Sequence, residues 1–304
     1  MKAIITGAFQ LSESEKQVLN DMGLDITIHH WEKEEVKNPE EYEIAICNGL
    51  FSYNPIEKFK NLKYIQLTSM GMDRMPMDYI KEHNIEIHNA GDVYALPIAE
   101  WVIMRILEIY KNAVHFYKAQ SERKWNKCRN MLELSGKKVC IVGTGNIGRE
   151  IAKRIKAFNV EVVGLNRSGK EVEYFDECKT ISEWETTIAD SDIVILALPL
   201  TKDTENMVDE KWFNTMKNSA ILVNVARGKI VDEKALEEAI RDEKIMAAAL
   251  DVFVEEPMNE NHSFWDYENI LISPHNSYVG ENNHKRLFEI VKKNLEKVVY
   301  GEDR

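Results

Sequence analysis

A glycine-rich loop joins a predicted strand to a predicted helix in VCIVGTGNIGREIAKRI, residues 139–155. Gly143, Gly145 and Gly148 have the spacing G-x-G-x-x-G. In a dinucleotide-binding fold the first glycine permits a tight turn, the second lets the backbone approach a pyrophosphate, and the third lets the helix pack on the strand. The helix N-terminus favours the anion. The hexapeptide alone could be an ordinary turn, but its place between strand and amphipathic helix predicts a dinucleotide site.

The turn after the next predicted strand, GLNRSGK at 164–170, bears on which dinucleotide is bound. An acidic residue here would accept hydrogen bonds from the adenosine ribose of NAD and would repel a 2′-phosphate. Asn166 removes that repulsion, whereas Arg167 and Ser168 supply donors suited to phosphate oxygens. The turn therefore predicts a preference for NADP, with NAD still possible. The alternative is a surface turn in which Arg167 is merely solvated.

Four charged or titratable residues closely follow predicted strands in the second half of the chain. They are Arg227, Asp251, Glu256 and His275. The carboxyl ends of strands in an open parallel sheet line the ligand crevice, so we expect these side chains to converge on one edge. Each alone could be a solvated, capping or turn residue. Their joint arrangement beside a cofactor loop favours a functional site.

Short apolar runs alternate with predicted helices along the chain. The runs in the first hundred residues are AIIT, DITI, EIAIC, KYIQL and IEIH, and the pattern restarts at KVCIV, VEVVGL, DIVILAL, AILVNV, MAAAL and NILIS. A helix is predicted over Ser12 to Met22, where Ser12 and Glu15 have capping-box spacing. Strands separated by helices form parallel sheets. We therefore predict an α/β protein with two Rossmann-like, doubly wound parallel-sheet domains and a cleft between them.

Two further segments are predicted to be helical. The stretch from Ile98 to Tyr117 is long enough to span a bilayer but contains charged residues, which favours a helix of a folded domain over a membrane anchor. The segment from His284 to Tyr300 has apolar residues at helical spacing, and no strand follows it. We expect it to pack on the first unit.

Composition excludes several classes of partner. A chain of 304 residues with 44% apolar content is long enough for about two domains. A formal charge of −12 argues against nucleic acid. The four cysteines fit neither a zinc site nor a disulfide framework, and the eight histidines lack ligand spacing apart from adjacent His29 and His30. We therefore expect a cytoplasmic protein with no metal and no membrane partner.

The ordered motifs resemble the D-isomer-specific 2-hydroxyacid dehydrogenase family, in particular its glyoxylate and hydroxypyruvate reductases. The resemblance covers nearly the whole chain and lies in LTSMGMD (67–73), AEW (99–101), the glycine loop, LPLTKDTENMV (198–208), NVARG (224–228), LDVFVEEP (250–257) and SPH (273–275). It implies a flavodoxin-like substrate domain, 1–97 with 279–304, and a dinucleotide-binding domain, 98–278. It also implies a homodimer whose interface includes the helix near 98–118.

The resemblance implies roles for individual residues. Arg227 would bind the carboxylate of a 2-oxo acid and polarise its carbonyl, with backbone amides near Met70, Gly71 and Met72 completing the site. His275 would be the acid and base, and Glu256 its carboxylate partner.

A larger set is implied at the nicotinamide cofactor. Its members are Gly143, Thr144, Gly145, Asn146, Ile147, Gly148, Asn166, Arg167, Ser168, Leu198, Pro199, Thr204, Val225, Ala226 and Asp251.

Two positions depart from the family pattern. Asn166 stands where an aspartate is typical, which weakens an assignment to NAD. Asn48, a candidate substrate residue, stands where phosphoglycerate-handling members usually carry an arginine, so a substrate phosphate has no obvious partner. The prediction is an NAD(P)H-dependent enzyme that reduces glyoxylate, hydroxypyruvate, pyruvate or a similar small 2-oxo acid to the D-2-hydroxy acid. The alternatives are an NAD-dependent D-3-phosphoglycerate dehydrogenase and a non-enzymatic, cofactor-sensing protein like the family's co-repressor.

Overall fold

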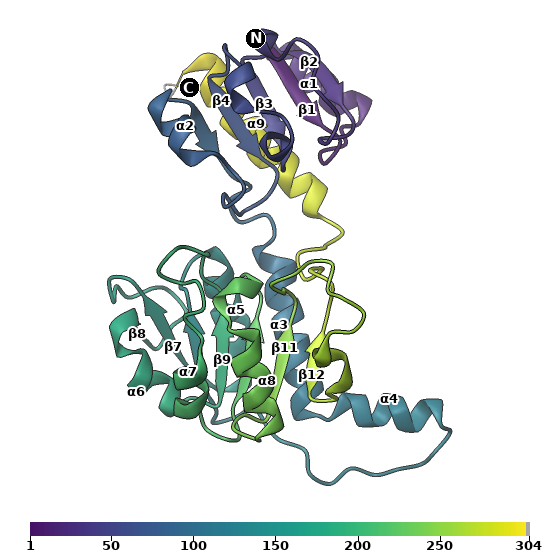
Figure 1. Ribbon diagram of the computed structural model, residues 1–304, viewed down its shortest axis with the longest axis vertical. Coiled ribbons are helices and arrows are strands. Elements are labelled where there is room, and N and C mark those ends of the chain that lie inside the picture. Colours follow the sequence, from purple (N-terminus) through teal and green to yellow (C-terminus); the bar gives the residue numbers. More distant parts are fainter. Residues whose placement is uncertain (302–304) are drawn as a thin grey trace. The chain divides into compact units, whose positions relative to one another are not determined.

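The computed structural model describes residues 1–301 and divides into two compact units. Among the described residues, unit 1 contains 1–94 and 280–301, and unit 2 contains Ala95–Val279. Each unit has a fully parallel β-sheet with helices packed on it (Figure 1). The predicted fold class, two doubly wound α/β domains, is therefore confirmed.

Unit 1 is built on a five-stranded sheet in the order β2-β1-β3-β4-β5. Its strands are β1 (Lys2–Thr6), β2 (Asp25–His29), β3 (Ile44–Cys47), β4 (Tyr64–Leu67) and β5 (Glu86–His88). Its helices are α1 (Glu13–Asp21), α2 (Met77–Glu82) and α9 (Asn283–Tyr300), with short 3-10 turns η1 (Pro39–Glu41), η2 (Leu50–Ser52) and η3 (Ile56–Lys58).

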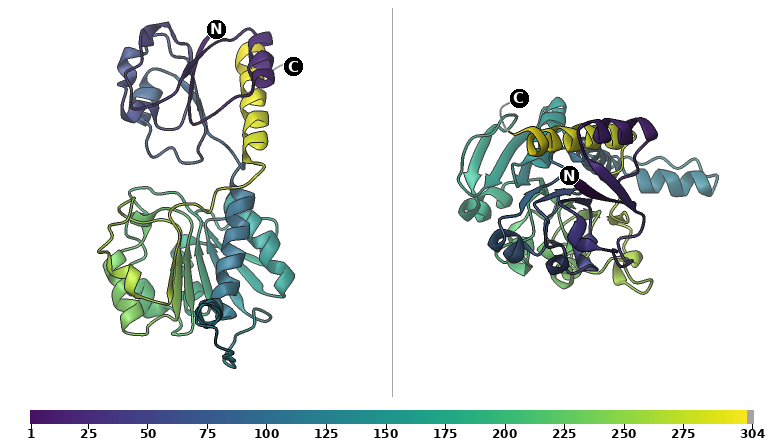
Figure 2. Two further views of the ribbon diagram at one scale, coloured as in Figure 1. Left: turned by 90° about the vertical axis from the view of Figure 1, so that its right-hand side faces the viewer. Right: turned by 90° about the horizontal axis from the view of Figure 1, so that it is seen from above.

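Alternating side chains of the unit 1 strands enter two separate cores. On one face, Ile5 and Ile46 pack with Leu19 of α1 and with Val291 and Leu295 of α9. Figure 2 shows α1 and α9 lying side by side on this face. The predicted capping box at the start of α1 and the predicted C-terminal helix on the first unit are both confirmed.

Unit 2 is built on a seven-stranded sheet in the order β12-β11-β10-β9-β6-β7-β8. Its strands are β6 (Lys138–Val142), β7 (Glu161–Asn166), β8 (Glu177–Thr180), β9 (Ile193–Leu196), β10 (Ile221–Asn224), β11 (Ala247–Leu250) and β12 (Ile270–Ile272). All the runs predicted as strands form strands. The sequence did not predict β8, because this edge strand, ECKT, buries only Cys178.

Helices cover both faces of the unit 2 sheet. They are α3 (Ala95–Tyr110), α4 (Ala113–Ser121), α5 (Asn146–Ile155), α6 (Trp184–Ala189), α7 (Glu210–Thr215) and α8 (Glu233–Arg241), with η4 (Lys156–Phe158), η5 (Ile181–Glu183), η6 (Gly228–Ile230) and η7 (Ser263–Asp266). Helices α6, α7 and α8 pack on one face, where they bury side chains that include Ile188, Trp212 and Leu236. On the other face α3 and α5 pack against each other and against β11 and β6. This packing fixes the strand ends that carry the candidate site.

The single helix predicted over 98–117 is wrong, because the structure contains two helices there. Between α3 and α4, Asn112 has φ of +52°, in the left-handed region. Asparagine tolerates that conformation better than most residues, so the helix ends and the chain turns. In Figure 1, α4 projects from the body of unit 2. Within residues 1–301, no helix combines the length and apolar character needed to cross a membrane.

Candidate functional site

Two glycines of the 143–148 loop are required by the protein's own packing. Gly143 has φ of +103°, and a Cβ there would lie 2.4 Å from the carbonyl oxygen of Ala197. A Cβ on Gly148 would lie 2.0 Å from the carbonyl oxygen of Gly143. These two positions therefore let the loop turn between β6 and α5 and bring the helix against it.

Gly145 differs from the other two glycines. Its backbone is extended, with φ of −72°, and no atom of the described residues lies within 4 Å of the place where a Cβ would be. It is the N-cap of α5, where no side chain caps the helix and no acidic residue lies in the first turn. The open space and the first-turn amides fit the pyrophosphate of a dinucleotide.

Asn166, the last residue of β7, organises the turn that follows. Its Oδ1 accepts hydrogen bonds from the N–H groups of Ser168 (3.0 Å) and Gly169 (2.7 Å). Its Nδ2 donates to Thr144 Oγ1 (3.2 Å) and to the carbonyl of Lys170 (3.0 Å). An aspartate has no donor for the last two contacts. Asn166 therefore ties the turn to the glycine loop without a negative charge.

Arg167 lies exposed at the tip of this turn. None of the described residues forms a hydrogen bond or ion pair with its guanidinium, so the group is available to an external anion. The turn thus joins an exposed cation to a neutral anchor, which is the charge pattern the sequence predicted.

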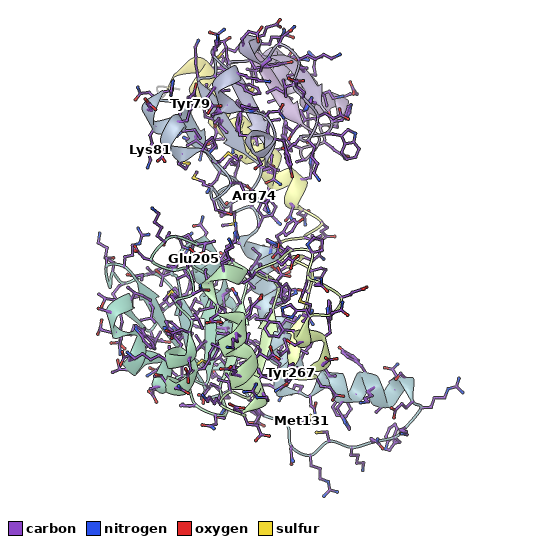
Figure 3. The ribbon with its side chains drawn as sticks, in the orientation of Figure 1. Arg74, Tyr79, Lys81, Met131, Glu205 and Tyr267 are labelled. Atoms are coloured by element: carbon purple, nitrogen blue, oxygen red, sulfur yellow. The ribbon has the colours of Figure 1, made fainter. Side chains whose placement is uncertain are left out.

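The remaining cofactor candidates follow β9 and β10. The Thr204 hydroxyl accepts from the N–H of Thr201 (2.7 Å) and donates to the carbonyl of Pro199 (2.8 Å), which closes the loop that begins at Leu198. Glu205, labelled in Figure 3, is the next residue of this loop. After β10, Val225 and Ala226 are buried. The loops therefore lie at the same sheet edge as the glycine loop.

His275 and Glu256 form a close pair. Nδ1 of His275 lies 2.7 Å from Oε2 of Glu256, and Oε1 accepts a hydrogen bond from the N–H of Phe253 (3.0 Å). Partial burial by itself raises the pKa of Glu256, but the hydrogen bonds from His275 and Phe253 and the charges of His275 and Arg227 outweigh it and lower the pKa. The carboxylate is therefore ionised at neutral pH, and the imidazole Nδ1 faces it.

Asp251 holds the turn that carries His275. Its side chain is 1% exposed and accepts hydrogen bonds from the hydroxyl of Ser273 and from the N–H groups of Asn276 (2.8 Å) and Ser277 (3.0 Å). Its carbonyl accepts from the N–H of His275 (2.7 Å), which has φ of +49°. Asp251 was predicted as a cofactor residue, and in the structure both of its carboxylate oxygens are engaged in positioning His275.

The loop of Arg227 lies directly against the loop of Glu256. A Cβ on Gly228 would be 1.9 Å from the carbonyl carbon of Phe253, so only glycine allows this approach. The half-buried Arg227 donates to the carbonyl of Ala226 (2.7 Å), and its charge contributes to the lowered pKa of Glu256. Unit 2 therefore brings Arg227, Glu256 and His275 together.

The predicted substrate residues of unit 1 lie in the loop after β4 and at the end of β3. The carbonyl of Met70 accepts from Asn89 Nδ2 (2.8 Å), and that of Met72 accepts from the N–H of Met75 (3.0 Å). By contrast, the N–H groups of Met70, Gly71 and Met72 have no acceptor among the described residues. Arg74 follows this loop (Figure 3). Free amides of this kind suit a carboxylate.

The structure gives Asn48 a contact that the sequence did not predict. Its backbone N–H donates to Oε1 of Glu32 (2.7 Å), a residue in the segment after β2. Glu32 belongs to the polar run HHWEKEE, where nothing distinguishes it from its acidic neighbours. The hydroxyl of Thr6, at the end of β1, also donates to Oε1 of Glu32 (2.7 Å).

Comparison with known proteins gives a consistent result. Residues 103–277 match the family model described as D-isomer specific 2-hydroxyacid dehydrogenase, NAD binding domain. A D-3-phosphoglycerate dehydrogenase of Methanocaldococcus jannaschii is 33% identical over 249 residues, which cover 81% of this chain and 47% of the relative. A hydroxypyruvate reductase of Thermotoga maritima is 32% identical over 273 residues, which cover 86% and 87%.

Similarity also extends to solved structures. A glyoxylate reductase from Paecilomyes thermophila superposes with a TM-score of 0.86 at 25% identity, over 98% of this chain and 95% of that one. The chain spans about half the length of the phosphoglycerate dehydrogenase and most of the length of the other two proteins.

The contrast between Gly145 and Gly148 gives a test of the cofactor loop. We expect Gly145→Ala to leave thermal unfolding unchanged, because the added Cβ meets no protein atom, and to weaken dinucleotide binding at least about tenfold. Gly148→Ala should instead destabilise the protein by roughly 1–3 kcal/mol through overpacking. Differential scanning fluorimetry and fluorescence titration with NADPH measure the two effects. Unchanged nucleotide affinity in Gly145→Ala would contradict the assignment.

Proposed function

The chain belongs to the D-isomer specific 2-hydroxyacid dehydrogenases, and we propose that it uses NADPH to reduce a small, unphosphorylated 2-oxo acid to the D-2-hydroxy acid. Candidate substrates are glyoxylate, hydroxypyruvate and pyruvate. The observation that carries the proposal is the pair formed by His275 and Glu256, which are 36% and 33% exposed in their side chains and hence open to a ligand. Turnover of a panel of 2-oxo acids with NADPH and NADH tests it.

In this proposal His275 is the general acid. Glu256 accepts from Nδ1, so it stabilises the protonated ring and leaves Nε2 as the atom that gives its proton to the substrate carbonyl oxygen. The lowered pKa of Glu256 keeps this partner negative through the neutral range. In the oxidising direction the same nitrogen would take the proton back.

Arg227 and the free amides of Met70, Gly71 and Met72 are proposed to bind the substrate carboxylate. A guanidinium donates two parallel hydrogen bonds to a carboxylate, and it can also polarise the adjacent carbonyl. Loop amides add donors without further charge. The guanidinium would also stabilise the negative charge that develops on the carbonyl oxygen.

The 143–148 loop and the loops after β7, β9 and β10 are proposed to hold the dinucleotide. When bound, the reduced nicotinamide supplies the hydride that the carbonyl carbon accepts. Arg167 and Ser168 would donate to a 2′-phosphate, and Asn166 adds no opposing charge. These residues favour NADPH over NADH.

Two alternatives are less well supported. Phosphoglycerate oxidation would need a cation for the substrate phosphate. The residue after β3 is the neutral Asn48, and its backbone N–H already donates to Glu32. A cofactor-sensing binding protein would not need the arrangement of Arg227, Glu256 and His275. Measured turnover distinguishes an enzyme from such a protein.

We also propose a homodimer. Several large apolar side chains are exposed on α4 and the segment after it, among them Phe116 (37%), Tyr117 (60%) and Trp125 (93%). A contact between two copies would remove this surface from water, which is a favourable process.

We expect Glu256→Gln to move the falling limb of the pH profile for reduction to lower pH. The protonated imidazole loses its carboxylate partner and releases its proton more readily, so the rate at neutral pH falls. The matched control is Glu255→Gln, which removes the same charge from an exposed neighbour. The effect is measured as kcat/KM for reduction at pH values from 5 to 9 in the unmodified protein and both variants. A shift of the falling limb in Glu255→Gln and not in Glu256→Gln would contradict this expectation and would make Glu255 the carboxylate partner of His275.

We expect Arg227→Ala to lower kcat/KM by at least about a hundredfold, because the substrate carboxylate and the developing oxyanion lose a charge-assisted donor. Arg227→Lys should recover only part of this, since an ammonium cannot bind both carboxylate oxygens in one plane. Nucleotide affinity should hardly change. Lys229→Ala, which removes an exposed charge from the same loop, is the control. Near-normal turnover by Arg227→Ala would remove Arg227 from the site.

We expect catalytic efficiency with NADPH to exceed that with NADH by more than about tenfold, because each lost charge-assisted contact costs roughly 1.5–3 kcal/mol. Asn166→Asp combined with Arg167→Ala should flatten or reverse the preference, since the new carboxylate repels the 2′-phosphate and accepts from the ribose of NADH. Added salt should reduce the advantage of NADPH. Equal efficiencies in the unmodified protein would mean that Arg167 is simply solvated.

A further inference from the structure

The carboxylate of Glu32 lies at the carboxyl edge of the unit 1 sheet. Its Oε1 accepts hydrogen bonds from Thr6 Oγ1 and from the N–H of Asn48, both at 2.7 Å, and its Oε2 accepts from the N–H of Gly49 at 2.8 Å. Thr6 ends β1 and Asn48 follows β3, so one carboxylate joins two neighbouring strand ends. In the part of the chain that the structure describes, it forms no ion pair. A negative charge is therefore held here by neutral donors alone.

The main chain around Glu32 is fixed by a buried asparagine. Asn54 is 5% exposed, and its Nδ2 donates to the carbonyls of Glu32 (2.9 Å) and Glu34 (3.2 Å). Its Oδ1 accepts from the N–H of Val36 (3.0 Å). Because Asn54 anchors the chain from Glu32 to Val36, the carboxylate of Glu32 keeps its place at the sheet edge.

The proposed substrate loop begins at the neighbouring strand end. The loop containing Met70 and Met72 follows β4, which pairs with β3, and the N–H of Thr68 donates to the carbonyl of Cys47 (2.9 Å). Adjacent strands lie about 5 Å apart, so the carboxylate of Glu32 lies within about 5–10 Å of the start of this loop.

Few cations compensate the charge at this edge. Residues 7–15, 48–57 and 68–73, which follow β1, β3 and β4, contain no lysine or arginine. Lys33, next to Glu32 in the chain, places its Nζ 5.7 Å from the centre of the Tyr53 ring. Arg74 directly follows residues 68–73, and it forms no ion pair with Glu32 among the described residues.

We propose that Glu32 determines substrate specificity by rejecting 2-oxo acids that carry a second anionic group, such as a phosphate. The inference rests on the proposed function, since it takes the Met70–Met72 loop as part of the substrate site. Glu32 acts in two ways: it occupies the amides of Asn48 and Gly49, which an incoming oxyanion would otherwise use, and its charge repels that oxyanion. At this separation a single charge changes the relative efficiency by about tenfold.

The kinetic test compares hydroxypyruvate with 3-phosphohydroxypyruvate in the same preparations of full-length protein with saturating NADPH. Glu32→Gln should raise the efficiency of the phosphorylated substrate relative to the other by at least about tenfold, chiefly through its KM. The ratio cancels any general loss of activity. Glu34→Gln is the matched control because it removes the same charge two residues away, from an exposed side chain. It should leave the ratio unchanged.

A second variant keeps the structure around Glu32 intact. Asn48→Arg retains the backbone N–H that Glu32 accepts and places a cation beside the carboxylate, so the ratio should rise here too. An unchanged ratio in both folded variants, checked by circular dichroism, overturns the proposal. An equal rise in Glu34→Gln also overturns it, because the effect would then come from net charge and not from the position of Glu32.

Failure of the proposed function is distinguishable from failure of this inference. If the unmodified protein reduces none of glyoxylate, hydroxypyruvate, pyruvate and 3-phosphohydroxypyruvate, the proposed function is contradicted, and calorimetric titration with inorganic phosphate then decides the role of Glu32. Binding gained by Glu32→Ala and not by Glu34→Ala supports exclusion of oxyanions by Glu32. Equal affinity in the unmodified protein and both variants overturns it.

Discussion

The buried carboxylate of Asp251 accepts hydrogen bonds from Ser273, Asn276 and Ser277, and its carbonyl accepts the N–H of His275. A non-glycine residue with positive φ, such as His275, costs about 1–3 kcal/mol. Charge-assisted hydrogen bonds contribute about 1.5–3 kcal/mol each, so the three to Asp251 outweigh that cost. The turn is thereby held in the one conformation that brings the imidazole to Glu256. The proposed catalytic pair of His275 and Glu256 depends on this interaction.

In both sheets, polar groups near the carboxyl ends of the strands are held in place by contacts between neighbouring loops. In unit 2 the loop of Arg227 reaches Phe253 because Gly228 has no side chain. In unit 1 a carboxylate, Glu32, accepts from the Thr6 hydroxyl at the end of β1 and from the N–H of Asn48 just after β3. The edges differ in charge: unit 2 presents a guanidinium and an imidazole, whereas unit 1 presents free amides beside an anion.

The features that the sequence predicted well are those set by local chemistry. The capping box of Ser12 and Glu15, the apolar strands and the placing of Arg227, Glu256 and His275 at strand ends follow from residue type and spacing. Features that depend on a particular backbone conformation were missed. The apolar spacing of this segment does not predict the left-handed backbone conformation of Asn112. Strand β8 forms because it pairs with β7 at the edge of the sheet, and its own sequence does not predict a strand. Glu32 was missed for a similar reason, since two of its three partners are the backbone amides of Asn48 and Gly49, which carry no sequence signature.

The central claim, that His275 is the general acid of a 2-oxo acid reductase, is tested most directly by His275→Asn. Asparagine tolerates the left-handed backbone, so the turn held by Asp251 should persist while the ionisable ring is lost. The measurement is kcat for the best 2-oxo acid substrate of the unmodified protein, with NADPH affinity determined separately. The account predicts a fall in kcat of about a hundredfold or more with nucleotide affinity nearly unchanged. A kcat within about threefold of the unmodified enzyme, with nucleotide still bound, would contradict it.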